Sequence, residues 1–205
     1  PAQRLTAEAA LAHSWIEGLA QGAKDVMIGD RQLNNMKNFC DLNKLKQSAL
    51  HVIAGRLHDR EIKQLKDTFM ALDKSGDGVI SIAELKEGIL HLNQDGAGVD
   101  VLDFLDRLDT NGSDEVDYTE FISASLDEKY YREEGICWTA FRYFDRDGNG
   151  VISMSELKEV LTDCSVESLG LSMDISSVER VLKEVDTNGD QEIDFDEFMM
   201  MMRSG

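Results

Sequence analysis

The sequence predicts an all-α fold built from helix–loop–helix units, and three observations support this prediction. First, four twelve-residue segments share one pattern of oxygen-bearing residues and begin at Asp73, Asp109, Asp145 and Asp186. Second, these segments start 36, 36 and 41 residues apart, a spacing typical of repeated supersecondary units. Third, apolar residues recur at three- to four-residue spacing before each segment, as on one face of a helix. Strands are expected only as one short bridge in each pair of units.

The composition narrows the class of function. Of the 205 residues, 42% are hydrophobic, which is ample for packed cores. The formal net charge is −19, so nucleic acid and anionic membrane surfaces are poor candidate partners, whereas cation binding is favoured. The sequence contains no apolar run long enough to span a membrane. Cys40, Cys137 and Cys164 are odd in number and lack paired spacing, so we expect reduced thiols in a cytoplasmic protein.

The N-terminal part predicts two helices joined by a linker. Residues 1–20 have an amphipathic helical pattern with Thr6 as the expected N-cap, and residues 21–32 contain two glycines and are expected to be a linker. Residues 34–57 predict one basic amphipathic helix, the kind of segment that a calmodulin-type groove binds. An ordinary surface helix packed on a core is the alternative. The expected apolar anchors of this helix are Met36, Phe39, Leu42, Leu45, Leu50 and Ile53.

The four repeated segments have the chemistry of a metal-binding loop. In the third segment, residues 145–156, oxygen-bearing side chains occupy positions one, three, five, nine and twelve, and Gly150 occupies position six. This is the calcium loop of an EF-hand, where position seven offers its backbone carbonyl and a glutamate at position twelve supplies both oxygens. The predicted ligands, in loops one to four, are Asp73, Ser75, Asp77, Val79, Ser81 and Glu84; Asp109, Asn111, Ser113, Glu115, Asp117 and Glu120; Asp145, Asp147, Asn149, Val151, Ser153 and Glu156; and Asp186, Asn188, Asp190, Glu192, Asp194 and Glu197.

Two loops depart from the pattern at position six, where Asp114 and Gln191 replace glycine. This position usually needs a positive φ, which costs a non-glycine residue roughly 1 kcal/mol. Loop four has one more side-chain carboxylate among its ligands than the other loops, which favours binding. We therefore expect all four loops to bind calcium, with an empty loop two as the main alternative.

EF-hands function in pairs, because the position-eight residues of two loops can bridge to each other. The expected lobes are residues 59–127, with loops one and two, and residues 128–205, with loops three and four. The run 199–202 contains four methionines, which could fill a core or line an adaptable groove, and the longer connection before loop four is expected in residues 167–175. The expected bridges are Ile80 with Val116 and Ile152 with Ile193, and the expected aromatic core residues are Phe69, Phe121, Phe141 and Phe198.

The sequence does not support catalytic or zinc-binding chemistry in this chain. Cys40 and His51 have no accompanying motif of a thiol protease, and no Cys/His spacing suggests zinc. The glycine-rich loop, strand lysine, HRD and DFG elements of a kinase are absent from the sequence. We therefore expect this chain not to be an enzyme.

The order of the parts resembles the C-terminal portion of the calcium-dependent protein kinases of plants and apicomplexans. Residues 1–20 are similar to the last helix of a kinase catalytic domain, with Ser14 in place of the usual proline, and a chance alanine-rich helix is the alternative. The matching residues there are Arg4, Thr6, Ala7, Ala10, Leu11, His13, Trp15 and Ile16. Residues 21–58 resemble that family's linker and autoinhibitory junction, through Met36, Lys37, Phe39, Asn43, Lys44, Leu45, Lys46, Ala49, Leu50, Val52, Ile53 and Ala54.

The resemblance implies a mechanism for the regulation of a Ser/Thr protein kinase. At resting calcium, the junction would block the active site of a kinase domain outside this chain. With up to four Ca²⁺ bound, the lobes would open and hold the junction as a helix, which relieves the autoinhibition. The implied partners are the chain's own junction helix and the kinase domain of the parent protein, while the oligomeric state stays open.

Two further expectations concern the whole protein. Because the first residue is proline and not methionine, we expect a processed or excised piece of a longer chain, either free in the cytoplasm or attached to a membrane by a lipidated N-terminus. The alternative to kinase regulation is a free-standing calmodulin-like calcium sensor or buffer that acts on a partner in trans. A free sensor would have no need for a basic target helix of its own.

Overall fold

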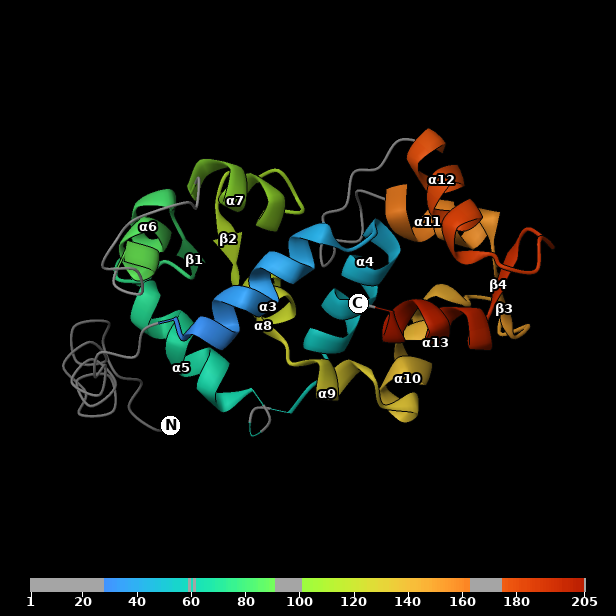
Figure 1. The fold of residues 1–205 in the computed structure, drawn as a ribbon, viewed down its shortest axis with the longest axis horizontal. Helices are drawn as coiled ribbons and strands as arrows, with labels where there is room; N and C mark the ends of the chain where they lie inside the picture. Colours follow the sequence, from blue (N-terminus) through green and yellow to red (C-terminus); the bar gives the residue numbers. More distant parts are fainter. Residues whose placement is uncertain (1–27, 59, 61, 91–100, 163–174, 205) are drawn as a thin grey trace, which may run out of the picture.

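The computed structural model describes residues 28–58, 60, 62–90, 101–162 and 175–204. In this part of the chain the fold is all-α apart from two short antiparallel ribbons, which confirms the predicted class (Figure 1). The helix predicted in residues 1–20, the linker up to residue 27 and most of the connection 167–175 lie outside the described residues. The elements are α3 (Asp30–Asp41), α4 (Lys44–Ala54), α5 (Lys63–Leu72), β1 (Val79–Ile80), α6 (Ile82–Leu90), α7 (Val101–Leu108), β2 (Val116–Asp117), α8 (Tyr118–Ser125), α9 (Glu128–Tyr131), α10 (Glu134–Phe144), β3 (Val151–Ser153), α11 (Met154–Thr162), α12 (Ile175–Val185), β4 (Glu192–Asp194) and α13 (Phe195–Arg203).

The two ribbons join the loops of each lobe in the predicted register. Strand β1 pairs with β2 so that Ile80 lies opposite Val116, and β3 pairs with β4 so that Ile152 lies opposite Ile193. All four side chains are at most 1% exposed. The position-eight residues therefore tie two loops together and also bury apolar surface in the lobe core, and both predicted bridges are confirmed.

Aromatic side chains form the centre of each lobe. The rings of Phe69 and Phe121 meet edge to face at 5.5 Å between centroids, and Phe141 meets Phe198 in the same way at 5.5 Å. All four are at most 5% exposed, as predicted. In the methionine run, three side chains are buried and Met200 is 60% exposed. Core filling thus accounts for the buried methionines.

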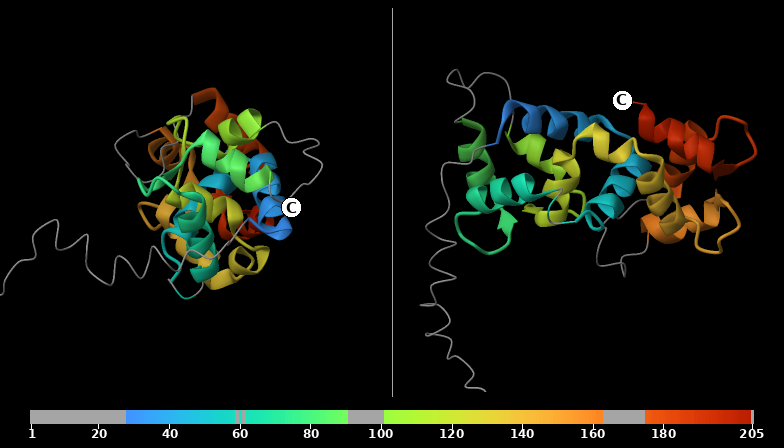
Figure 2. Two further views of the ribbon diagram at one scale, coloured as in Figure 1. Left: turned by 90° about the vertical axis from the view of Figure 1, so that its left-hand side faces the viewer. Right: turned by 90° about the horizontal axis from the view of Figure 1, so that it is seen from below.

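The molecule is elongated, with one lobe at each end (Figure 1; Figure 2). Helices α5 to α8 form lobe one, α10 to α13 form lobe two, and α9 lies between them. Helix α3 packs along α7 and α8 of lobe one. Helix α4 lies at the centre of the molecule, between α8 of lobe one and α10 of lobe two.

The prediction of one continuous helix over residues 34–57 is wrong, because two helices cover this segment. Leu42 is extended, with φ −73° and ψ 152°, and ends α3. The Asn43 side chain then accepts the Lys46 amide at 2.8 Å and begins α4, as an N-cap does. Helix α3 also begins at Asp30, within the predicted linker, because the Gln32 side chain accepts the amide of Gly29 at 2.8 Å.

Two further sequence expectations concern membranes and thiols. None of the described helices is long and apolar enough to cross a bilayer. Cys40 and Cys137 are free thiols, and Cys164 lies outside the described residues. Burial raises the pKa of both thiols to about 11, so little thiolate forms at neutral pH.

Replacement of Asn43 tests the break between α3 and α4. Asn43→Ala should lower the free energy of unfolding by about 1 kcal/mol, because the first turn of α4 loses a side-chain acceptor. The measurement is urea denaturation of the complete chain. Asn43→Ser is the matched control, because it keeps a capping oxygen without a charge beside Glu184, and it should stay near wild type. Equal losses in both variants would contradict the capping role.

Candidate metal centres

Backbone amides fix the aspartate at position one of each loop. In loop three, Asp145 accepts the amide of Gly148 at 2.8 Å with Oδ1 and the amide of Gly150 at 3.1 Å with Oδ2. The first aspartates of the other three loops accept amides from positions four and six in the same way. The chain itself therefore orients this carboxylate identically in all four loops.

The glutamate at position twelve is held in a similar manner. Glu156 Oε1 accepts the amides of Arg146 and Asp147 at 2.9 and 3.3 Å, and Oε2 accepts the amide of Ser153 at 2.8 Å. The other three glutamates repeat these contacts with positions two, three and nine. Each glutamate thus folds back over its own loop with both oxygens fixed.

The donor set fits a calcium ion. Ligand oxygens of Asp145, Asp147 and Glu156 lie within 4.8 Å of one another. Carboxylate, amide, hydroxyl and carbonyl oxygens are hard ligands, which suit Ca²⁺ and not zinc. The other predicted ligands in the four loops are exposed or half-buried and accessible to an ion: Ser75, Asp77, Val79, Ser81, Asn111, Ser113, Glu115, Asp117, Asn149, Val151, Ser153, Asn188, Asp190, Glu192 and Asp194.

The backbone at position six follows the prediction. Asp114 has φ 65° and Gln191 has φ 69°, the only non-glycine residues with positive φ in the described chain. Gly78 and Gly150 occupy the same position in loops one and three with φ 92° and 93°. Loops two and four therefore contain a local backbone strain that loops one and three avoid.

Even- and odd-numbered loops support their glutamates from different sides. In loops two and four, a threonine at position two donates its hydroxyl to the glutamate, at 2.9 Å for Thr110 and 3.0 Å for Thr187. In loops one and three, a serine at position nine donates instead, at 2.8 Å for Ser81 and 2.7 Å for Ser153. This difference was not predicted, although Thr110 and Thr187 occupy position two of their loops in the sequence.

Burial and hydrogen bonding oppose each other at the glutamates. At Glu84, burial raises the pKa, but the donors of Ser81 and neighbouring amides outweigh it and lower the pKa to about 2. The same balance lowers the pKa of Glu156. Glu120 is 1% exposed, and its burial raises its pKa in spite of similar donors. Glu120 therefore has a less stabilised charged form than Glu84 and Glu156 have.

The predicted junction anchors are brought together against the lobes. Five of the six lie on α3 and α4, which pack on α7, α8 and α10. Leu42, at the break between the helices, is half-buried, and the other five are at most 2% exposed: Met36, Phe39, Leu45, Leu50 and Ile53.

Helix α4 is buried on all sides, which the amphipathic pattern did not predict. Every residue from Leu45 to Ala54 is buried, polar ones included. The Gln47 amide donates to the carbonyl of Phe39 at 2.9 Å, and the Ser48 hydroxyl donates to the carbonyl of Lys44 at 2.6 Å. The amphipathic pattern predicts an exposed polar face for this helix, but α8 and α10, which are distant in the sequence, enclose it from both lobes.

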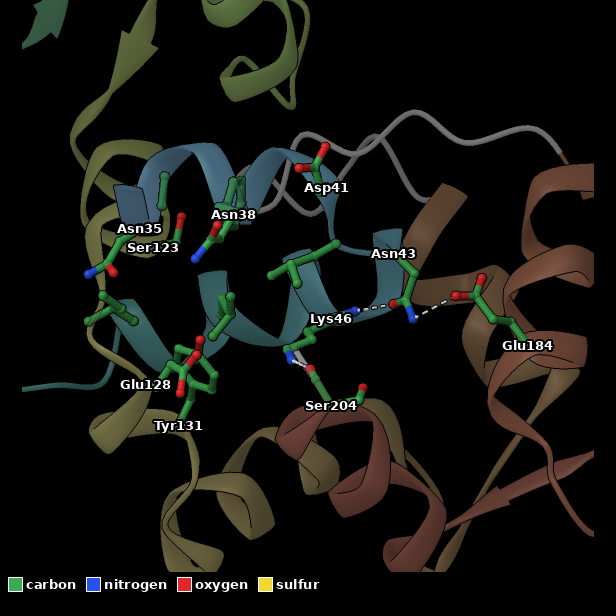
Figure 3. Close-up of a pocket in the computed structure, with 15 residues that line it drawn as sticks. Asn35, Asn38, Asp41, Asn43, Lys46, Ser123, Glu128, Tyr131, Glu184 and Ser204 are labelled. Atoms are coloured by element: carbon green, nitrogen blue, oxygen red, sulfur yellow. Dashed lines mark hydrogen bonds between the residues drawn. The ribbon is translucent and has the colours of Figure 1, made fainter. Parts of the chain in front are cut away.

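Lys46 reaches the end of the chain across a cavity of about 440 Å³ (Figure 3). Its ammonium donates to the carbonyl of Ser204 and lies 5.4 Å from the centre of the Tyr131 ring. Burial lowers the pKa of Lys46, and the nearby Glu128 carboxylate opposes that shift. At the rim, the Asn43 side chain lies 3.5 Å from a carboxylate oxygen of Glu184 on α12. The centre of the molecule thus joins α4 to both lobes.

Position six offers a direct test of loop strain. Asp114→Gly should tighten calcium binding to loop two by about three- to fivefold, because it removes roughly 1 kcal/mol of left-handed strain. The measurement is calcium titration against a chromophoric chelator. Gly150→Ala is the matched control and should weaken loop three, since the added Cβ would meet nothing within 4 Å and only backbone strain changes. Weaker binding by Asp114→Gly would contradict this account.

Comparison with known proteins agrees with the geometry. Residues 62–126 and 133–203 each match the family described as the EF-hand domain pair. The whole chain is 39% identical to calcium-dependent protein kinase 3 and 37% identical to calcium-dependent protein kinase 16 of Oryza sativa subsp. japonica, and it covers 36% of each. Over 98% of its length it is 37% identical to calcium-dependent protein kinase 5 of Plasmodium falciparum, of which it covers 35%.

The chain therefore spans about a third of the length of these curated relatives. The two family matches together cover more than half of the chain and contain all four loops. The chain belongs to the EF-hand domain pair family, as a calcium-binding region homologous to part of the calcium-dependent protein kinases.

Proposed function

We propose that this chain is the calcium-sensing regulatory region of a Ser/Thr protein kinase. Its four loops bind calcium, its lobes then hold α3 and α4, and this withdraws the segment from the active site of a kinase domain in the same protein. In this proposal, residues 1–20 end the kinase domain and residues 21–58 are linker and junction. Residues 59–127 and 128–205 are the two sensing lobes. Similarity to calcium-dependent protein kinases over the whole chain supports this division.

The observation that carries the proposal is the enclosure of α4. Leu45, Leu50 and Ile53 are at most 2% exposed and lie between the lobes. Burying each such side chain contributes about 1.5–3 kcal/mol. The apolar surface that a target helix would cover is thus occupied by the chain's own helix. A free-standing sensor acting in trans would first have to displace α4, so the geometry favours an intramolecular target.

The two lobes contact different parts of the segment formed by α3 and α4. Lobe one contacts α3 through α7 and α8 and also contacts α4 through α8, whereas α10 of lobe two contacts α4. Ion pairs of Arg107 with Asp41 and of Arg31 with Asp127 join the segment to its surroundings. Three of the four charged side chains are exposed, so these pairs orient the helices more than they stabilise them. Full burial of α4 therefore requires both lobes together.

The loops are connected to the helices that hold the segment. Bound calcium supplies positive charge, and four ions would offset eight of the nineteen net negative charges. Each position-twelve glutamate lies in the first turn of α6, α8, α11 or α13. A rearrangement of these carboxylates is therefore transmitted to helices, and α8 is one that packs on both α3 and α4. The coupling requires the docked arrangement to bind calcium more tightly than the released one.

Replacing an apolar anchor with glutamate tests whether α3 and α4 are the internal target that the lobes bind. Phe39→Glu or Leu45→Glu should release α3 and α4, because an ionised carboxylate cannot be buried at these apolar sites without a cost of several kcal/mol. In calcium, binding of an apolar-surface dye should rise clearly above wild type. Lys37→Glu and Lys44→Glu are matched controls at exposed neighbouring positions and should leave dye binding unchanged. Wild-type dye binding by both anchor variants would refute the internal target.

A kinase assay tests the regulatory role. A peptide of residues 30–57 should inhibit the isolated catalytic domain of the similar rice kinase 3, whereas a scrambled peptide should not. The complete chain in calcium should inhibit about tenfold less than the peptide, because only the released fraction of the segment is available. Phosphorylation of a Ser/Thr peptide is measured in each case. A peptide without effect, or a complete chain as potent as the peptide, would contradict the proposal.

A further inference from the structure

A buried histidine of α4 faces loop two. His51 is 3% exposed, and its ring packs 5.9 Å from the ring of Phe39. Its Nδ1 lies 3.0 Å from the carbonyl of Gln47, to which it can only donate. Burial lowers the pKa of His51, so the ring is neutral at neutral pH and Nε2 is an acceptor.

Two hydroxyl groups of lobe one meet this acceptor. Thr110 Oγ1 lies 3.3 Å and Ser123 Oγ lies 3.4 Å from His51 Nε2. Thr110 is position two of loop two, and Ser123 follows the loop within α8. The histidine therefore joins the junction segment to both ends of one metal-binding loop.

The same two hydroxyls contact Glu120, the position-twelve ligand of loop two. Thr110 Oγ1 lies 2.9 Å from the Glu120 carboxylate, and Ser123 Oγ lies 2.9 Å from the Glu120 carbonyl. Two hydroxyl protons thus serve three acceptors: the imidazole nitrogen, the carboxylate and the carbonyl. All of these groups are buried or half-buried, so a change at one acceptor redirects the hydrogen bonds of the others.

Loop four provides an internal comparison. Thr187 donates to Glu197 at 3.0 Å, as Thr110 donates to Glu120. In the described part of the chain, no side chain of α3 or α4 is bonded to Thr187. Met200, which is 60% exposed, stands where loop two has Ser123. The link from α4 to a position-twelve glutamate is therefore specific to loop two.

We infer that His51 is a positioning residue for the second calcium site, through which docking of α4 sets the calcium affinity of loop two. The contact holds the hydroxyls of Thr110 and Ser123 beside Glu120. Because coupling is reciprocal, calcium in loop two strengthens the docking of α4 by the same factor. This inference rests on the proposed function for the docking of α4. Under it, loop two is the calcium site whose affinity depends directly on whether α4 is docked.

Site-resolved calcium titration of the complete chain tests the inference. The backbone amides of Asp114 and Gln191 report loops two and four separately by NMR. His51→Phe keeps the ring and its packing but removes the acceptor, and it should weaken loop two by about three- to tenfold while loop four stays unchanged. His51→Gln, which retains a side-chain acceptor, should restore most of the affinity. Equal weakening of both loops, or no change in loop two, would overturn the inference.

A double-mutant cycle with matched threonines completes the test. Thr110→Val should weaken loop two, and adding His51→Phe should then cause a smaller loss than it does in the wild type, since one of the two contacts of His51 Nε2 is already absent. Thr187→Val should weaken loop four to an extent that does not depend on residue 51. Additive effects of His51→Phe and Thr110→Val would overturn the inference. If Phe39→Glu still releases α4 in that case, the proposed function survives; if Phe39→Glu has no effect, the proposed function has failed independently.

Discussion

The enclosure of α4 between α8 and α10 is the constraint on which the rest of the structure depends. A helix buried on all sides has no solvent for its polar groups, so each needs a protein partner. The Lys46 ammonium donates to the carbonyl of Ser204, and the side-chain NH₂ of Gln47 donates to the carbonyl of Phe39, whereas Gln47 Oε1 has no hydrogen-bond partner in the described part of the chain. The same requirement brings His51 to loop two. The C-terminus, the end of α3 and one metal site are thus all arranged around this helix.

The loops meet a second constraint, which is to hold clustered carboxylates in place. Backbone amides satisfy it at positions one and twelve in every loop, so the chain itself orients these ligands. Loop two differs from the others in its surroundings. Its glutamate, Glu120, lies on α8, the helix that packs on both α3 and α4. The sensing and target-holding parts of the molecule therefore share one helix in lobe one.

The sequence predicted the features that depend on local chemistry and spacing. The ligand pattern located all four loops, the position-eight residues predicted the bridge between Ile80 and Val116, and the missing glycine predicted a positive φ at Asp114. The break at Leu42 was not predictable, because apolar spacing continues across it and Asn43 looks like any exposed polar residue. The burial of Lys46 and the partners of His51 depend on residues far away in the sequence, and no local pattern encodes such contacts.

The central claim is that calcium binding and the enclosure of α4 are one coupled equilibrium. Hydrogen exchange of the backbone amides of residues 45–54, measured in the complete chain with calcium and with a chelator, tests it most directly. The account predicts slower exchange of these amides in calcium, because the docked helix is then the favoured state. Exchange rates that are equal in both conditions, or faster in calcium, would contradict it.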